Sequence, residues 1–212
     1  VGGTIPVLIS LWWQRGSRSA TTNRDPHEFA RSCDLSANVT VVDLQVPSLE
    51  LLGGGYMPLS GIGLTGRDNR LTEQQVFDFL MLGGRHIDGA ICYMNTVEMG
   101  KGILRAVRCG VPRSEVFVTS KILPHHFLNA VDVVQREILG PAGLEYLDLL
   151  LIHFPTTHTN YEMQVEGKNS YNECVAKYGS WRSCWENTWK VLTDLKRRGV
   201  VRHLGVSNCG PQ

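Results

Sequence analysis

The stretch Leu147-Asp148-Leu149-Leu150-Leu151-Ile152-His153 decides the fold class, because it is an almost continuous apolar run. Such a run is typical of a β-strand that is covered on both faces, as in a parallel sheet wrapped by helices. Outward from it, short apolar runs predict four further strands, at 59–64, 85–88, 116–121 and 200–206. The stretch at 147–153 is therefore the fourth of five expected strands.

The segments between these strands have the apolar spacing of amphipathic helices. Thr72-Glu73-Gln74-Gln75 predicts a capping box that begins a first helix, which Gly83-Gly84 ends. A second helix is expected over about 96–108 with Gly110 as its stop, and Gly140-Pro141 is expected to break a third. The expected apolar faces are Val76, Phe79 and Leu80; Val97, Ile103, Leu104 and Val107; and Val131, Val134, Ile138 and Leu139.

Two other regions frame this alternation. An irregular, polar stretch is expected from Thr156 to about Ser180, before a long helix that Gly199 ends. That helix carries Trp181, Trp185, Trp189, Leu192 and Leu195 at helical spacing. Ahead of the first strand, residues 46–58 predict a hairpin, because Gly53-Gly54-Gly55 supplies the positive φ that a tight turn needs.

Strand and helix in regular alternation predict a parallel α/β fold, for which two architectures compete. A doubly wound dinucleotide-binding sheet needs GxGxxG after its first strand, and Gly61-Ile62-Gly63-Leu64-Thr65-Gly66 misses the last spacing by one residue. A (β/α) barrel instead places its working residues at the carboxyl ends of several strands. The position of the polar residues therefore distinguishes the two.

Polar side chains follow one expected strand after another: Asp88, Tyr93, Lys121, His153 and Ser207-Asn208. Taken singly, each has an ordinary structural explanation as a solvated rim charge, a core residue or a structural Asp88–Lys121 ion pair. In a parallel barrel these strand ends meet on one rim. Because a buried charged pair is costly unless it is well hydrogen-bonded, the set together indicates a functional site.

This set suits the protonation of an alkoxide. A tyrosine hydroxyl is a poor proton donor at neutral pH, and a nearby ammonium stabilises the phenolate that remains after proton transfer. Lys121 fits that role, with Asp88 to hold it in place and His153 to orient a carbonyl oxygen against the Tyr93 hydroxyl. The residues therefore predict a carbonyl-reducing site.

Four segments, in order and spacing, resemble successive blocks of the aldo-keto reductases. They are Gly83-Gly84-Arg85-His86-Ile87-Asp88-Gly89-Ala90-Ile91-Cys92-Tyr93-Met94-Asn95, Phe117-Val118-Thr119-Ser120-Lys121, Leu147-Asp148-Leu149-Leu150-Leu151-Ile152-His153-Phe154-Pro155 and Leu204-Gly205-Val206-Ser207-Asn208. The lead-in Met57-Pro58 to Gly61-Ile62-Gly63 and Thr188-Trp189 with Leu192 and Leu195 also agree. The resemblance covers roughly 46–212.

The resemblance implies a (β/α)8 TIM barrel with an N-terminal hairpin and a catalytic tetrad of Asp88, Tyr93, Lys121 and His153. Tyr93 would be the general acid for hydride transfer from a nicotinamide to an aldehyde or ketone. The implied cofactor is NADPH, with NADH as the alternative, held by Gly63, Leu64, Asp88, Ser207 and Asn208. Thr65 and Phe154 would line the substrate pocket.

The sequence departs from the family pattern at the pocket edge and in length. Leu64 replaces a frequent threonine, Thr65 replaces a frequent aromatic residue, and Met94 and Thr96 alter the surroundings of Asn95. These changes favour an altered substrate preference. A complete barrel needs about 250 residues, whereas about 165 lie between the hairpin and Gln212. We expect about five of eight strands, and a chain that is unstable or inactive by itself.

Composition bounds the partners and the compartment. The formal net charge of +1 provides no basic field for nucleic acid, so a small-molecule carbonyl is the expected partner, with no membrane association and no prediction of oligomeric state. The six cysteines are scattered without a CxxC pair, which favours buried thiols in a reducing, cytoplasmic compartment. The sequon Asn38-Val39-Thr40 is compatible with secretion.

The first 45 residues have no assigned role and form an expected extension ahead of the domain at 46–212. The chain begins with Val1, and its apolar run at 5–13 is too short for a membrane span. This run is compatible with the tail of a signal or anchor segment, a strand, or part of an unrelated region. Residues 14–36 have the composition of a linker.

Three alternatives to a reductase remain open from the residues. A barrel of the same family can act as a binding or regulatory subunit. Lys121 at a strand end suits a Schiff-base aldolase, although Tyr93 and Asp88 fit that role less naturally. A metal site from His86, Asp88 and His153 is the weakest alternative, so no metal is expected.

Overall fold

The computed structural model describes residues 44–66, 68–154 and 169–209, all within one compact unit, Cys33–Gln212. The apolar run at 5–13, the linker at 14–36 and the sequon at Asn38 lie outside the described residues. The same holds for residues 155–168, which include much of the expected irregular stretch.

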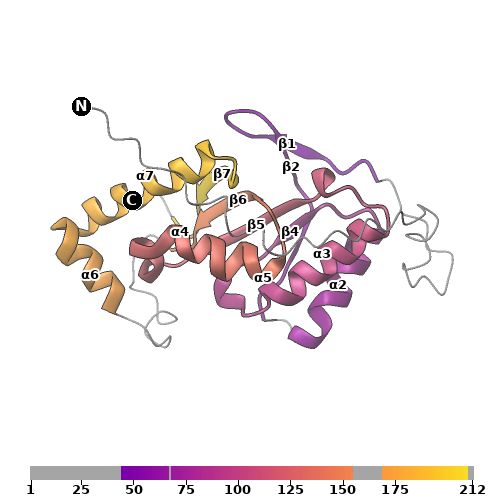
Figure 1. The fold of residues 1–212 in the computed structure, drawn as a ribbon. Coiled ribbons are helices and arrows are strands. Elements are labelled where there is room, and N and C mark those ends of the chain that lie inside the picture. The colour runs from indigo at the N-terminus through magenta and orange to yellow at the C-terminus, as the bar shows by residue number, and fades with distance from the viewer. Residues whose placement is uncertain (1–43, 67, 155–168, 210–212) are drawn as a thin grey trace, which may run out of the picture. The chain divides into compact units, whose positions relative to one another are not determined.

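A sheet of five parallel strands forms the centre of the described chain (Figure 1). The strands are β3 (Gly61–Gly63), β4 (His86–Asp88), β5 (Phe117–Ile122), β6 (Leu147–Ile152) and β7 (Val201–Val206), and they lie side by side in chain order. A doubly wound sheet reverses its strand order at a switch point. The unbroken order therefore excludes that alternative and fits part of a (β/α) barrel, as the alternation of the sequence predicts.

A separate two-stranded hairpin precedes the sheet, as predicted. Its strands β1 (Ser48–Glu50) and β2 (Tyr56–Pro58) are antiparallel. Gly53, Gly54 and Gly55 all adopt φ near +90°, between +88° and +92°, and the Leu51 amide donates to the Gly55 carbonyl across the turn. These dihedrals are unfavourable for residues with a Cβ, which explains the glycine triplet.

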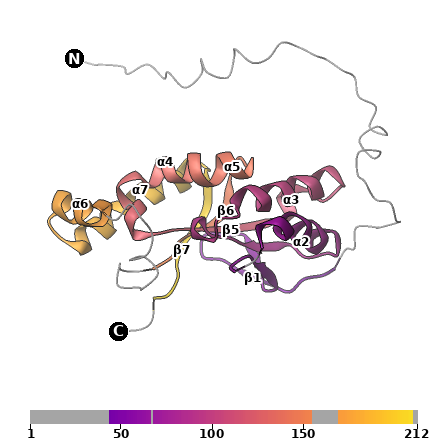
Figure 2. The same cartoon turned by 90° about the horizontal axis from the view of Figure 1, so that it is seen from below.

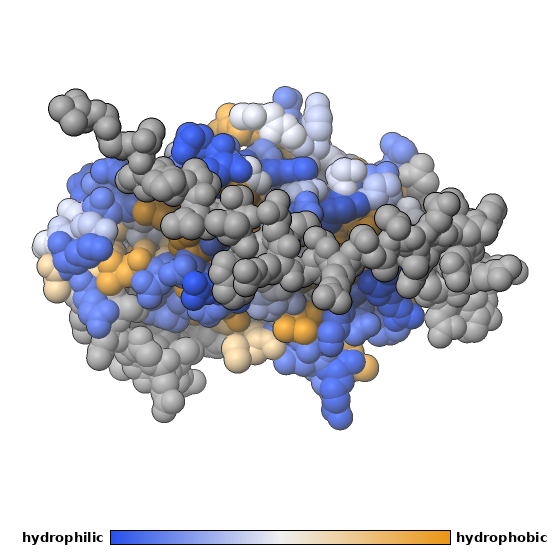
Figure 3. Space-filling model, in the orientation of Figure 1, coloured by the Kyte–Doolittle hydropathy of each residue, from blue (hydrophilic) through white to orange (hydrophobic). Residues whose placement is uncertain are grey.

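The helices pack against their neighbours along one layer. In Figure 2, α3, α5, α4 and α7 lie on one side of the strands, and the residue contacts join α2 to α3, α3 to α5, and α4 to α7. Among the residues that are coloured in Figure 3, most of the visible surface is hydrophilic and the apolar areas are small. The helical elements are α2 (Asn69–Met81), α3 (Thr96–Arg108), α4 (Ala130–Val133), α5 (Gly140–Ala142), α6 (Asn169–Tyr178) and α7 (Trp181–Arg197), with 3-10 turns η1 (Ile91–Tyr93), η2 (Arg113–Glu115) and η3 (Pro124–Asn129), and the π-helical turn η4 (Val134–Leu139).

The predicted start of α2 was wrong, because the helix begins one turn earlier than the capping box suggested. Asp68 is the N-cap, and its carboxylate accepts the Arg70 backbone amide at 3.0 Å. Thr72 lies inside the helix, where its hydroxyl donates to the Asp68 carbonyl oxygen at 3.3 Å. Asp is a more favourable N-cap than Thr, so the helix begins at the Asp68 cap rather than at Thr72.

The prediction that Gly140-Pro141 breaks the third helix was also wrong. The helical path runs from α4 through η4 into α5 and ends at Gly143, whose φ is +65°. The Gly140 amide donates to the Gln135 carbonyl in a wide π turn. Such a turn changes the hydrogen-bond register just before Pro141, so the missing proline amide interrupts no regular α-helical bond.

Two smaller expectations also differ from the structure. Val97 lies at the exposed start of α3, 39% exposed, whereas the buried face of that helix includes Met99, Ile103 and Ala106. The segment expected to be irregular up to about Ser180 contains α6. Gly179, with φ of +81°, separates α6 from α7.

The expectation that all cysteines are thiols was wrong. Cys174 in α6 and Cys184 in α7 form a disulfide, with both side chains fully buried, and Cys109 is disulfide-bonded as well. The Cα atoms of Cys174 and Cys184 lie 5.7 Å apart, within the range that a disulfide requires. Sequence spacing alone did not show that α6 folds back on α7. Cys92 and Cys209 are not in disulfides.

The hydrophobic core lies between the sheet and the helices. Ile87, Val118, Leu150 and Ile152 from the strands are fully buried, and α7 contributes Leu192 and Leu195 to the same cluster. The three predicted tryptophans of α7 are partly buried against this core. Within the described ranges, no helix is long and apolar enough to cross a lipid bilayer.

Candidate active site

The parallel register brings the predicted polar residues to one end of the sheet. Asp88 closes β4, Lys121 is the next-to-last residue of β5, and His153 directly follows β6. Ile152 pairs with Val206, so Ser207 begins the loop beside His153. The carboxyl ends of four neighbouring strands therefore form one rim, as the barrel hypothesis predicted.

Lys121 is the central charge of this rim and is 5% exposed. Its Nζ donates to Asp88 Oδ1 at 2.6 Å, to the Gly89 carbonyl oxygen at 3.0 Å and to the Tyr93 hydroxyl oxygen at 3.3 Å. These contacts use all three donors of the ammonium group, so the buried charge is fully hydrogen-bonded. The arrangement places a positive charge directly beside the phenol oxygen.

Tyr93 is held by the short turn η1 and the loop after it. The Tyr93 amide donates to the Ala90 carbonyl, and Met94 leaves the turn in a left-handed conformation, with φ of +57°. Asn69 Nδ2 donates to the Met94 carbonyl at 2.7 Å, and the buried Asn95 donates to the Leu64 carbonyl at 3.0 Å. Two asparagine side chains therefore fix the loop that carries the phenol.

His153 is 7% exposed and lies edge-on to the Tyr93 ring, with the ring centroids 5.9 Å apart and the planes at 78°. The imidazole also stacks on the Phe154 ring, with the ring centroids 4.5 Å apart. The pKa of His153 is lowered from 6.5 to about 4, chiefly by burial and also by the Lys121 charge, while the Asp88 charge partly opposes the shift. The imidazole is therefore neutral at pH 7.

Ser207 and Asn208 stand next to His153. The Ser207 amide donates to the Ile152 carbonyl at 2.8 Å. Asn208 has φ of +56°, and its Nδ2 donates to the His153 carbonyl oxygen at 2.8 Å and to Ser207 Oγ at 3.2 Å. Both amide hydrogens of Asn208 are thus used inside the chain, and its Oδ1 is the group left to accept a hydrogen bond.

The residues at the end of β3 and just after it differ in burial. Gly63 and Thr65 are exposed, whereas the Leu64 side chain is fully buried in the core. The Leu64 amide donates to the Asp88 carbonyl, and its carbonyl accepts from Asn95. The Leu64 side chain therefore packs in the core, and a contact between Leu64 and a cofactor stays a prediction.

The sequence interpretation missed the residues that support this rim. Asn69, Asn95 and Cys92 contact the loop or the imidazole, and Cys92 Sγ lies 3.4 Å from His153 Nδ1. Asn95 and Cys92 belong to the segment that carries the family resemblance, so position in that segment was the available signal. Asn69 carried none, because its partner is 25 residues away in sequence.

His86 does not join Asp88 and His153 in a metal site. Its Nδ1 lies 3.0 Å from the Pro58 carbonyl oxygen, and its Nε2 lies 3.0 Å from Thr119 Oγ1. The ring thus connects the hairpin to β5. Within the part of the chain that the structure describes, no group of three or more His, Cys, Asp and Glu residues is arranged to hold a metal ion.

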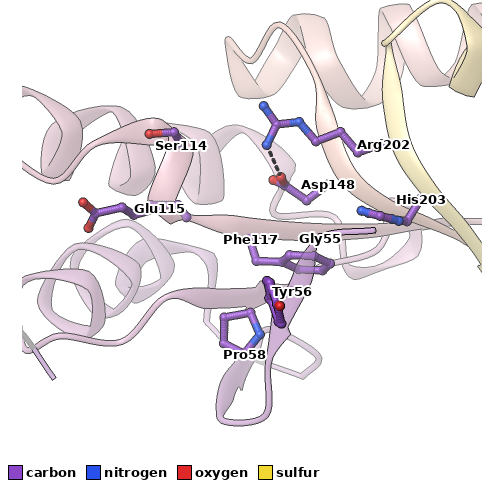
Figure 4. A pocket seen from close by; sticks show the side chains of 10 residues that line it. Gly55, Tyr56, Pro58, Ser114, Glu115, Phe117, Asp148, Arg202 and His203 are labelled. Atoms are coloured by element: carbon purple, nitrogen blue, oxygen red, sulfur yellow. Dashed lines mark hydrogen bonds and ion pairs between the residues drawn. The ribbon is translucent and has the colours of Figure 1, made fainter. Parts of the chain in front are cut away.

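A cavity of about 360 Å³ lies at the opposite, amino-terminal end of the strands (Figure 4). The hairpin residues Gly55, Tyr56 and Pro58 face it, as do Phe117 and His203. An ion pair between Arg202 and the buried Asp148, 3.1 Å long, forms part of its wall. In a barrel this end of the strands serves stability, and the cavity contains none of the predicted site residues.

The chain belongs to the aldo-keto reductases: the model of the Aldo/keto reductase family matches residues 55–212. Two similar solved structures agree with this assignment. An aldo/keto reductase from Brucella melitensis has a TM-score of 0.60 at 28% sequence identity. The matched region covers 80% of this chain and 55% of the Brucella chain. A Bombyx mori aldo-keto reductase in complex with NADP has a TM-score of 0.61 at 28% identity, covering 78% and 51%.

Curated relatives include sugar reductases of fungi. A probable NAD(P)H-dependent D-xylose reductase of Emericella nidulans is 32% identical over 168 residues, which is 78% of this chain and 53% of the relative. An NAD(P)H-dependent D-xylose reductase of Candida tropicalis is 32% identical over 174 residues, 77% of this chain and 51% of the relative. The chain spans about half the length of the curated relatives it matches.

Proposed function

We propose that the protein reduces aldehyde or ketone carbonyls to alcohols with NAD(P)H. The observation that carries this proposal is the contact of the Lys121 ammonium with both Asp88, at 2.6 Å, and the Tyr93 hydroxyl, at 3.3 Å. This contact stabilises the phenolate that remains after Tyr93 has given up a proton. Family membership and the NAD(P)H-dependent relatives support the same reaction class.

The proton step uses groups of this chain alone. Tyr93 donates its hydroxyl proton to the carbonyl oxygen as that oxygen becomes an alcohol. His153, which is neutral, donates a hydrogen bond that orients the oxygen. Asp88 keeps Lys121 in position, and Lys121 compensates the charge on the phenol oxygen. We therefore assign the catalytic roles to Asp88, Tyr93, Lys121 and His153.

The groups around β7 fit a nicotinamide carboxamide. Asn208 retains Oδ1 as an acceptor, because both its amide hydrogens bind within the chain. The Ser207 hydroxyl accepts from Asn208 and has its own proton to donate. An acceptor beside a donor complements the amide hydrogens and the carbonyl oxygen of a carboxamide. Bound NAD(P)H would supply the hydride, and we assign NADPH as the favoured form and NADH as the alternative.

Asp88 and Gly63 complete the proposed cofactor contacts. The Asp88 carboxylate is 38% exposed, so it keeps surface for a ribose hydroxyl while it binds Lys121. A Cβ at Gly63 would meet no atom within 4 Å, which leaves space for a ligand near the backbone. We also assign Leu64 to the cofactor contacts, through the backbone of this loop, because its side chain lies in the core. We assign Thr65 and Phe154 to the substrate pocket, within a barrel domain at 46–212 that follows an extension at 1–45.

The substrate in this proposal is a small carbonyl compound. The cytoplasm, which the scattered cysteines of the sequence favour, is the compartment that we propose to test. The buried Cys174–Cys184 disulfide is the feature that weighs against a strongly reducing compartment, because such bonds persist in oxidising surroundings. Quantifying the thiols of the denatured protein, purified under alkylating conditions from its native cells, tests this assignment. Thiols at Cys174 and Cys184 support the cytoplasm, and a disulfide there contradicts it.

A Schiff-base reaction at Lys121 is less well supported. An amine must lose its proton to attack a carbonyl, whereas Lys121 is paired with Asp88. NADPH oxidation by the whole protein with a panel of aldehydes tests the reductase proposal. Turnover of at least one aldehyde supports it, and borohydride trapping of substrate on Lys121 without NADPH turnover would overturn it.

A further inference from the structure

Cys92 is the one protein group, among the described residues, that hydrogen-bonds the His153 ring. Its Sγ lies 3.4 Å from Nδ1. The cysteine precedes Tyr93 in η1, whose backbone is fixed by the bonds from Tyr93 to Ala90 and from Met94 to Ile91. These bonds hold the Cys92 backbone within the same turn as Tyr93.

The imidazole is held in one orientation by its other neighbours. Phe154 stacks on one face at 4.5 Å, with the planes 17° apart, and the Tyr93 ring approaches edge-on. The carbonyl of His153 accepts from Asn208. Once the ring orientation is fixed, the remaining variable is the tautomer, that is, which of the two ring nitrogens carries the proton.

The thiol and the imidazole share one proton between S and Nδ1, and chemistry favours the sulfur. Burial and the Lys121 charge lower the pKa of His153 to about 4, so its imidazole is neutral at pH 7 and carries a single ring proton. An imidazole nitrogen is a better acceptor than a thiol sulfur, which accepts only weakly. The S–H therefore donates to Nδ1, and the remaining ring proton lies on Nε2.

We infer that Cys92 is a positioning residue that selects the Nε2–H tautomer of His153, so that Nε2 presents a donor to the carbonyl oxygen of the substrate. The opposite tautomer would place a lone pair there, which repels a carbonyl oxygen. This inference rests on the proposed function for its consequence in catalysis. The tautomer itself is a property of the protein without substrate.

Two other histidines provide internal references, because their hydrogen-bond partners determine which ring nitrogen carries the proton. His86 Nδ1 faces the Pro58 carbonyl, which only accepts, so that ring carries its proton on Nδ1. His126 Nδ1 accepts the Leu123 amide at 3.2 Å, so a neutral His126 carries its proton on Nε2. Neither ring contacts Cys92 in these bonds. Both tautomers are therefore represented in the same molecule.

Nitrogen-15 NMR of the whole protein labelled at histidine tests the inference, with resonances assigned from His153→Gln, His86→Gln and His126→Gln. In the wild type, His153 should match the His126 pattern rather than the His86 pattern. Cys92→Ala should lower the ratio of Nε2–H to Nδ1–H by about 2- to 10-fold, the effect of one lost hydrogen bond. Cys92→Ser should restore the ratio, because a hydroxyl also donates. The His86 and His126 resonances should stay unchanged.

A wild-type His153 protonated on Nδ1, or a ratio unchanged in Cys92→Ala, would overturn the inference. Cys209→Ala is the control for loss of a thiol. The Cys209 side chain is exposed, and its hydrogen bond is with the Ser207 carbonyl oxygen rather than with the His153 ring. In aldehyde reduction, kcat/KM should fall in Cys92→Ala and recover in Cys92→Ser. If no variant reduces aldehydes and the wild type does not either, the proposed function fails, and the tautomer measurement still decides the inference.

Discussion

Lys121 shows how one residue organises the site. Its three ammonium hydrogens bind a carboxylate, a backbone carbonyl and a phenol, and no donor is left over. This saturation explains how a lysine that is 5% exposed stays inside the protein without a large penalty. Because each ammonium hydrogen already has an acceptor within the protein, Lys121 has no hydrogen left to donate to a substrate.

Buried neutral histidines predict acid sensitivity. Burial lowers the pKa of His126 to about 3, with the adjacent His125 contributing, and that of His153 to about 4. Unfolded histidines bind protons below about pH 6.5, whereas these folded ones do not, so stability rises with pH through this range. It is lost as the pH falls from about 6.5 toward these lowered values, by up to about 1.4 kcal/mol per pH unit for each histidine.

His126→Asn should reduce this acid sensitivity. The asparagine oxygen still accepts the Leu123 amide, but it does not titrate. Urea unfolding of wild type and variant at pH 7 and pH 4.5 measures the effect: the variant should lose less stability between the two pH values. An equal loss in both proteins would contradict the assigned protonation of His126.

At the scale of single residues, the sequence predicted that Asp88, Tyr93, Lys121 and His153 come together, because each lies at or after the end of a recognisable strand. Their catalytic roles stay a proposal. It did not predict Asn69 or Cys92 as supports, because their contacts join segments 25 and 61 residues apart. It also did not predict the burial of Leu64. Local pattern locates a residue on an element, whereas its partners depend on how the elements pack.

Among the elements, α3 matches its predicted bounds and α2 does not. α3 has one start and a single glycine stop, Gly110, whereas α2 has two competing start signals in Asp68 and Thr72. The continuation of the helix through Gly140-Pro141 was not predicted, because it depends on a π turn that changes the hydrogen-bond register before the proline. The Cys174–Cys184 bond was missed because it depends on the packing of α6 against α7.

Gly100 in α3 offers a test of helix packing. A Cβ there would overlap the backbone of Ala142 in α5, where the two helices touch. Gly100→Ala should therefore destabilise the protein by about 1–3 kcal/mol, although alanine favours a helix. Urea unfolding measures the change. Lys101→Ala, an exposed change one residue away, is the control, and equal stability of the two variants would contradict the close packing.

For the whole molecule, the five-stranded sheet has two edges. In the described ranges, β3 pairs only with β4 and β7 only with β6. Unpaired edges of a parallel sheet expose backbone groups and apolar side chains, and Val206 on β7 is 43% exposed. The order of the strands was predictable from their alternation, because consecutive strands of a barrel are neighbours.

We predict that the 212-residue chain, expressed by itself, unfolds over a broad temperature range and binds NADPH weakly. The two open edges leave the sheet less cooperative than a closed barrel. Circular dichroism during heating and NADPH fluorescence titration measure the two properties. A sharp melting transition together with tight NADPH binding would contradict this prediction.

The central claim is that Tyr93 donates the proton in carbonyl reduction. It is tested most directly by kcat/KM for NADPH-dependent aldehyde reduction in Tyr93→Phe, with the exposed Tyr56→Phe at the opposite end of the strands as the matched control. We predict a loss of about 10²- to 10⁴-fold in Tyr93→Phe, as expected for a general acid, and wild-type activity in Tyr56→Phe. Equal activity of the two variants would contradict the claim.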